Sequence, residues 1–328
     1  MSNIELRVPM NLMSTSASNI PASPASLRGG SPPDELPQVV GVVAEGIEET
    51  IIEPRKGWIA VDWAELRRSR ELLYFLVWRD IKVRYKQAAL GILWAVLVPV
   101  VQVTIFTLIF SSGLSLASLL GPSFDKSHYP VYIFSAILVW QVISRSMTDG
   151  GLSLINQQHL LTKIYFPRLF VPTAAVGGAL FDLVISLPVF ALVMAWVGVP
   201  LSWNVLLFPL LAVHAALLGS GLAYLLSALT VTYRDFRFII PFVNQILMWV
   251  SFIMIPVPPQ LLESWKWQTL FHLNPVYGIV AGARKALMDL NHGWSWTAYL
   301  TSLAVTLAIF TFGVFFFRRT ERRFADIA

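Results

Sequence analysis

Long apolar segments without charged side chains limit the folds open to this chain more than any other feature. The first runs from Ala88 to Phe110, and its 23 residues would form a helix about 34 Å long, enough to cross a bilayer. Comparable segments cover residues 129–151, 169–197, 203–231, 238–257 and 296–317. The second is the weakest, because it must continue past Arg145 and Asp149. The sequence predicts an all-α integral membrane protein with six transmembrane helices, in a domain covering residues 88–328.

The composition supports lipid as the solvent of this domain. Charged residues make up 13% of the chain and hydrophobic residues 56%, whereas about 25% of an ordinary soluble domain is charged. The net charge of +5 is too small to indicate a nucleic-acid partner. Cysteine is absent, which excludes disulfides and cysteine-ligated metals and leaves the redox compartment open.

The positions of Lys and Arg predict the orientation of the spans. Sixteen of them lie just before the first span, in the two loops on that side and after the sixth span, whereas four lie in the opposite loops. Because cytoplasmic loops carry the excess of basic residues, both termini are expected in the cytoplasm. Residues 1–57 form a tail rich in Ser, Pro, Ala and Gly from Ser14 to Pro37, which predicts disorder, and no signal peptide is evident.

An amphipathic helix is predicted over Ser69–Gln87, within a cytoplasmic interface region of residues 58–87. Its apolar positions follow helical spacing and comprise Tyr74, Val77, Trp78, Ile81 and Tyr85. Arg79, Lys82 and Lys86 fall on another face, as in helices that lie in the headgroup layer. Two interpretations stay open: a topology anchor, or a surface on which these cations gather a phosphorylated lipid headgroup.

Two further segments lie outside the predicted spans. Leu152–Arg168 contains a short helix that Pro167 terminates, and its polar residues would suit the docking of another protein. In the external loop, Asn274-Pro275 precedes a predicted amphipathic helix, Val276–Leu290. The latter is consistent either with an external re-entrant helical hairpin between spans five and six or with a helix resting on the bilayer.

Several kinds of chemistry are missing from the sequence. No Gly-Lys pair occurs, so the chain has no P-loop of its own, and no catalytic motif is evident. The five histidines lack metal-ligand spacing, so no metal site is predicted. Asp182 lies in the third span, where it has either a structural role or a role in transport.

Three stretches of the sequence resemble the ABC-2 type permeases that export polysaccharides. They are LLYFLVWRDIKVRYKQAALGILWAVLVPV (Leu72–Val100), LLTKIYFPRLFVP (Leu160–Pro172) and VTYRDFRFIIPFVNQILMW (Val231–Trp249). Asn274-Pro275 and the following helix with Arg284 resemble the external gate region of that family. The resemblance covers residue 58 to the C-terminus and is nearest to the O-antigen type, with capsule and teichoic acid exporters as near relatives.

The resemblance implies a permease homodimer in the bacterial inner membrane, with two copies of a separate ATPase subunit. This chain would bind no cofactor and would not itself be an enzyme, since ATP and Mg would lie on the partner. The substrate would be a glycan on a polyprenyl diphosphate. The implied ATPase-coupling helix comprises Asn156, Gln157, Gln158, His159, Leu160, Lys163, Tyr165, Phe166, Pro167 and Arg168. The implied gate near the lipid diphosphate comprises Trp78, Arg79, Lys82, Arg84, Tyr85 and Lys86.

Two other functions compete with this interpretation. A secondary transporter would use Asp182, although a single intramembrane acid and the lack of an internal repeat count against it. A membrane glycosyltransferase or acyltransferase would need clusters of acids and bases, which the sequence does not show.

Overall fold

The described part of this computed structural model consists of helices and their connections. It covers residues 67–86, 90–113, 125–158 and 166–321, and the predicted tail of residues 1–57 lies outside it. The contacts divide the chain after Pro54, and all the described residues belong to the second unit, Arg55–Ala328. No strand occurs among them. The predicted all-α class is therefore confirmed for this part of the chain.

Five helices of the described residues are long and apolar enough to cross a membrane. They are α3 (Leu93–Gly113), α5 (Tyr129–Asn156), α7 (Phe170–Val197), α8 (Phe208–Thr232) and α13 (Trp296–Glu321). Short 3-10 turns precede α5 and α8, namely η1 (Lys126–His128) and η2 (Trp203–Leu207). The predicted segments 169–197 and 296–317 coincide closely with α7 and α13.

The remaining helices are shorter. They are α2 (Arg70–Lys86), α9 (Phe236–Val250), α10 (Pro259–Glu263), α11 (Trp265–Leu273) and α12 (Pro275–Met288). A continuous span over residues 238–257 differs from the structure, because α9 ends at Val250 and residues 251–257 are not helical. At 15 residues, α9 is about 22 Å long, too short to cross a 30 Å hydrocarbon layer alone. The predicted count of six spans is therefore not confirmed.

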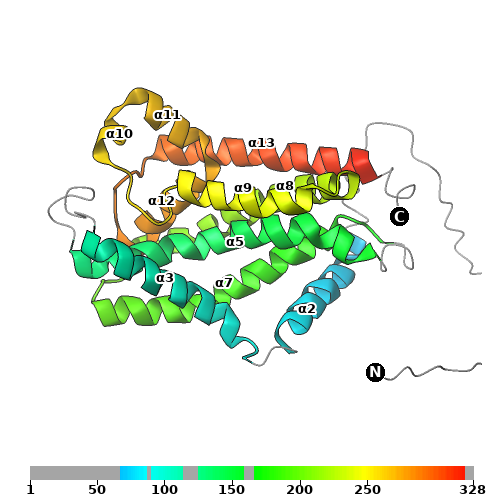
Figure 1. Ribbon diagram of the computed structural model, residues 1–328, viewed down its shortest axis with the longest axis horizontal. Coiled ribbons are helices and arrows are strands. Elements are labelled where there is room, and N and C mark those ends of the chain that lie inside the picture. The colour runs from blue at the N-terminus through cyan, green and yellow to red at the C-terminus, as the bar shows by residue number, and fades with distance from the viewer. Residues whose placement is uncertain (1–66, 87–89, 114–124, 159–165, 322–328) are drawn as a thin grey trace, which may run out of the picture. The chain divides into compact units, whose positions relative to one another are not determined.

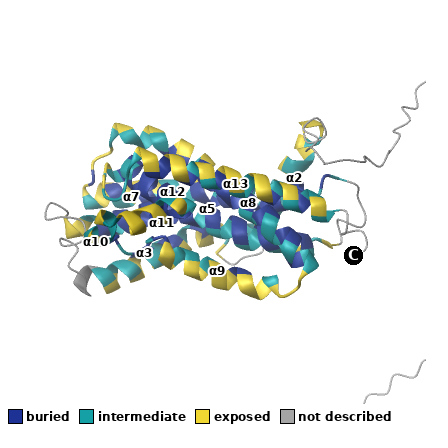
Figure 2. Cartoon of the chain, turned by 90° about the horizontal axis from the view of Figure 1, so that it is seen from above, coloured by how far each residue is buried: buried dark blue, intermediate teal, exposed yellow. Residues whose placement is uncertain are grey.

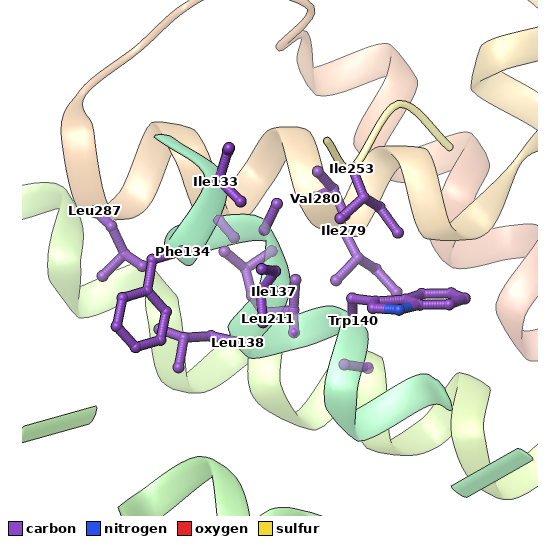
Figure 3. Close-up of a cluster of buried hydrophobic side chains, with 14 of the residues drawn as sticks. Ile133, Phe134, Ile137, Leu138, Trp140, Leu211, Ile253, Ile279, Val280 and Leu287 are labelled. Carbon is purple, nitrogen blue, oxygen red and sulfur yellow. The ribbon is translucent and has the colours of Figure 1, made fainter. Parts of the chain in front are cut away.

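Helix α5 forms the centre of the core. It is buried along most of its length and packs against α3, α7, α8, α9 and α12 (Figure 2). Ile137 of α5, Leu211 of α8 and Ile279 of α12 belong to one apolar cluster (Figure 3). The helices around it keep large apolar side chains exposed, for example Leu108 on α3, Leu192 on α7 and Phe312 on α13. Such surfaces are unfavourable in water and favourable in hydrocarbon.

The helices run between two ends of this unit. α2, the end of α5, the start of α7 and the end of α13 lie at one end, and α10 and α11 lie at the other (Figure 1). We call these the α2 end and the α11 end. Trp196, Trp203 and Trp296 are exposed at or beside the ends of α7, η2 and α13 that lie nearest the α11 end, as expected for an aromatic belt at a membrane surface.

Small residues allow α8 and α13 to cross closely. A methyl group built on Gly313 of α13 would lie 2.3 Å from the carbonyl oxygen of Gly221, and one on Gly221 would lie 2.7 Å from the Cα of Phe310. Both obstacles are backbone atoms, which cannot rotate away. Close backbone contact at small residues is a common basis of helix association in membranes.

We expect Gly313→Ala to destabilise the protein by about 1–3 kcal/mol, because α8 and α13 must separate to admit the added methyl group. Gly178→Ala in α7 is the matched control, since nothing lies within 4 Å of a methyl group built there. Thermal unfolding of both variants in one detergent checks the prediction. Equal melting temperatures would contradict the close crossing of α8 and α13.

Candidate functional site

Helix α2 packs on α7 through one apolar face. Leu76 is buried against Phe170 and Ala174, and Leu72, Leu73 and Val77 pack around them. A methyl group built on Gly177 would lie 2.7 Å from a Cγ atom of Val77, so the two helices are in close contact along this face. The predicted apolar stripe is only partly correct, because Tyr74 and Trp78 are exposed and do not belong to this cluster.

The opposite face of α2 presents aromatic and cationic side chains. Tyr74 is 70% exposed, and Phe75 and Trp78 are exposed beside it. The ammonium group of Lys82 lies 5.3 Å from the ring of Trp78, and Lys86 is exposed one turn further along. Aromatic rings with lysine are typical of a helix face at a membrane surface.

A cluster of five side chains connects the last turn of α2 to α5 and α7. We call Arg84, Tyr85, Arg145, Asp149 and Asp182 the Asp182 cluster. Asp182 of α7 accepts hydrogen bonds from Arg84 Nη1 at 3.0 Å, from Arg145 and from the hydroxyl of Tyr85. Arg84 Nη2 also donates to Asp149 Oδ2 at 2.5 Å.

The environment of Asp182 accounts for this number of donors. Its side chain is 1% exposed and lies within α7, a helix long and apolar enough to cross a membrane. An unpaired carboxylate there would be strongly destabilising, and removing one partner of a buried ion pair typically costs about 3–5 kcal/mol. Protonating Asp182 would leave Arg84 and Arg145 without their shared anion. This arrangement favours a structural role over that of a proton carrier.

The six predicted gate residues do not converge on one point. Arg79 bonds to Asp80 at 2.7 Å and to Gln157 Oε1 at 2.7 Å, and Arg84 and Tyr85 belong to the Asp182 cluster. Trp78, Lys82 and Lys86 lie on the exposed face. The structure thus separates the predicted cations into two that bind protein carboxylates and two that remain exposed.

The predicted ATPase-coupling residues are described only at their two ends. Asn156 ends α5, Gln157 follows as its C-terminal cap, and Gln158 is exposed. His159, Leu160, Lys163 and Tyr165 lie outside the described residues. Phe166 packs against α2 residues and against a second cluster that contains Leu154 and Phe317. Arg168 Nη1 donates to the carbonyl of Glu321 at 3.2 Å, and Pro167 precedes the start of α7.

At the α11 end, α12 is buried on nearly all sides among α5, α8 and α13. This burial differs from the predicted alternative in which the helix rests on the bilayer surface. Asn274 caps its start, because its Oδ1 accepts from the backbone N–H groups of Val276 and Tyr277. Arg284 is 3% exposed and lies over the ring of Tyr132, with 3.8 Å between guanidinium and ring centre.

Side chains donate hydrogen bonds to four carbonyl groups of the non-helical segment after α9. Arg284 Nη2 donates to the carbonyls of Phe252 and Ile253, at 3.0 and 2.8 Å. Tyr129 donates to Met254 and His292 Nε2 to Val257, at 2.8 and 2.9 Å. Burial lowers the pKa of His292, which favours the neutral ring in this contact. Non-helical backbone at membrane depth needs such internal partners.

Among the described residues, no group of three or more His, Asp and Glu side chains could hold a metal ion. The chemistry of the Asp182 cluster is ion pairing between helices. Sequence reasoning noted Asp182, Arg145 and Asp149 as charges near spans but missed their pairing with α2. The sequence feature that could have indicated this pairing is the position of Arg84 and Tyr85, at the end of a helix that precedes an apolar span.

A family model described as ABC-2 type transporter matches residues 71–288, from the second residue of α2 to the last of α12. The chain belongs to the ABC-2 type transporter family. The O-antigen export system permease protein RfbA of Myxococcus xanthus is 29% identical over 217 residues, which cover 66% of this chain and 80% of that protein. Two proteins of the same name from Klebsiella pneumoniae are 25% and 23% identical over 261 residues, covering 78% of this chain and 95% of each relative.

Membership of the ABC-2 family and five apolar helices identify a multi-pass membrane protein that serves as the transport subunit of an ABC transporter. In this family the ATPase is a separate subunit. The resemblance seen in the sequence is thereby confirmed. The described structure adds that ion pairs connect α2, which the family match includes, to α5 and α7.

We expect Arg284→Met to destabilise this ABC-2 chain by about 1–3 kcal/mol for each carbonyl left without a donor. Lys285→Met is the matched control on the next residue, because the ammonium group of Lys285 pairs with the exposed Asp289. The melting temperature of the purified protein measures both effects. If the two variants melt together, Arg284 does not support residues 251–257.

Proposed function

We propose that this chain is the membrane subunit of an ATP-driven exporter of a glycan carried on a polyprenyl diphosphate, of the O-antigen type. The observation that carries the proposal is the similarity to O-antigen export permeases over 95% of the length of two of them. The aligned region is long enough to contain α2, the segment between α5 and α7, and α10–α12. The family match over residues 71–288 also spans these parts of the chain.

In this proposal α2 lies at the cytoplasmic membrane surface and meets the lipid headgroup. The support is its division into two faces, one packed on α7 and one carrying Trp78, Lys82 and Lys86. Cations near the headgroup layer attract phosphates, and tryptophan suits the same depth. Because Arg79 and Arg84 already bind carboxylates, the first contact of the headgroup falls to Lys82 and Lys86.

Residues 156–168 would dock the ATPase subunit, which would bind ATP and Mg. The contact between Arg79 and Gln157 supports a mechanical link, because it joins α2 directly to the start of this segment. Gln157 also donates to Asp80 at 3.5 Å. A displacement of residues 156–168 by the ATPase would therefore reach α2 through side chains in contact.

The proposed topology has six spans, both termini in the cytoplasm and residence in the bacterial inner membrane. The fifth crossing would combine α9 with residues 251–257, whose carbonyls receive side-chain donors. The hairpin of α10, α11 and α12 would lie at the external end. Two permeases would pair, which agrees with the exposed apolar side chains of α3 and α9.

We expect a P-loop ATPase to co-purify with the tagged chain from its native membrane at a fixed stoichiometry. Lys163→Glu should reduce the recovered ATPase, since the change reverses a charge in the docking segment, whereas Lys266→Glu in α11 should not. Quantitative mass spectrometry of the eluate is the measurement. Recovery of the folded chain without any ATPase in several mild detergents would contradict the proposed assembly.

We expect Lys82→Glu combined with Lys86→Glu to reduce glycan export strongly while the protein still inserts and binds its ATPase. The reason is that two attractive contacts with the headgroup become repulsive. Arg67→Glu combined with Arg68→Glu is the charge-matched control before α2. Surface glycan and permease abundance are measured in the same cells. Loss of insertion in the α2 variant would instead support a topology anchor.

A further inference from the structure

The Asp182 cluster contains two arginines and two aspartates, so its formal charges cancel. Arg84 is the member that connects both acids, with Nη1 on Asp182 at 3.0 Å and Nη2 on Asp149 at 2.5 Å. Through these contacts α2 is bonded to α7 and to α5. Its apolar packing, by contrast, involves α7. The attachment of α2 to α7 is therefore both apolar and ionic, and the contacts described between α2 and α5 are polar.

The two acids differ in their access to solutes. The side chain of Asp182 is 1% exposed, whereas that of Asp149 is 44% exposed and that of Arg84 30%. A dissolved or lipid-borne anion can therefore reach the Arg84–Asp149 pair but not the Arg84–Asp182 pair. Arg145 also donates to Asp182, so the buried acid keeps a guanidinium partner if Arg84 shifts toward another anion.

We infer that a diphosphate group replaces Asp149 at Arg84, which breaks the ion pair between α2 and α5 while α2 stays bound to α7 and keeps its contact with Gln157. This inference rests on the proposed function, which supplies a diphosphate lipid at the same membrane surface. Phosphate oxygens can accept two parallel hydrogen bonds from a guanidinium, as a carboxylate does, and they carry more negative charge. Asp149 thus competes with the substrate for Arg84 and keeps this arginine paired with α5 until the substrate arrives.

The test measures binding of farnesyl diphosphate, farnesyl monophosphate and inorganic pyrophosphate to the complete permease–ATPase complex in detergent without nucleotide. Asp149→Asn should tighten binding of farnesyl diphosphate about fivefold, because a partly exposed ion pair no longer competes for Arg84. Arg84→Gln should weaken binding, and in the double variant the Asp149 change should have no effect. Asp235→Asn, at an exposed acid beside the start of α9, is the charge-matched control.

A cross-link verifies that α2 keeps its place in each variant. The natural chain has no cysteine, and a Cβ on Gly177 would lie 3.5 Å from the Cβ of Val77, within the range of a disulfide. Val77→Cys with Gly177→Cys should therefore cross-link α2 to α7 in every background. The cross-link should also form with farnesyl diphosphate bound, because the exchange leaves this contact intact.

The outcomes separate this inference from the proposed function. The exchange at Arg84 would be overturned if Asp149→Asn and Asp235→Asn raised the affinity for farnesyl diphosphate equally. It would also be overturned if the effect of Asp149→Asn persisted in the Arg84→Gln background. Either result would leave the substrate proposal intact. Loss of the cross-link on adding farnesyl diphosphate would overturn the retained α2–α7 contact. Preference for inorganic pyrophosphate over the lipid would assign the site to a soluble anion. Failure of every complex to bind farnesyl diphosphate would overturn both proposals.

Discussion

In hydrocarbon, a polar group without a partner destabilises a protein by several kcal/mol, and this constraint accounts for two features of the described residues. Residues 251–257 leave the helical path, and Arg284, Tyr129 and His292 supply donors to their carbonyls. Asp182 places a carboxylate inside the apolar bundle, and it receives donors from α2 and α5. In both places the requirement for partners joins segments that are far apart in the sequence.

Helix α2 depends on this requirement for its position. Its apolar face would pack on many surfaces, but Arg84 and Tyr85 fix its depth because their partner Asp182 occupies one point on α7. The same helix meets the end of α5 through Arg79 and Gln157. One short helix therefore contacts both the segment proposed to dock the ATPase and the acid pair proposed to respond to substrate. Through α2, ATPase docking and substrate binding would act on the same helix.

The sequence predicted the features that follow from local composition and missed those that depend on tertiary neighbours. Residues 169–197 and 296–317 appeared as spans because each is apolar over a bilayer thickness. The buried face of α2 was misassigned because Leu72, Leu73 and Leu76 compete with the aromatic stripe, and only α7 decides between them. Gly278 and Gly282 of α12 lie close to Ser302 and Leu211, which are tertiary neighbours that no local pattern identifies. The pairing of Arg84 with Asp182 joins positions 98 residues apart, which no local pattern encodes.

The Asp182 cluster also bears on whether this chain could drive transport by carrying protons. An acid that drives transport by carrying protons has to exist without its charge in part of the cycle. If Asp182 lost its charge, Arg145 would lose this anion and Arg84 would keep only its pair with Asp149, which is unfavourable inside the bundle. A force transmitted from Gln157 to α2 through Arg79 requires no change in the charge of Asp182. The ion pairs that stabilise the bundle therefore favour an energy source for transport that lies in a separate subunit, as in the ABC-2 family.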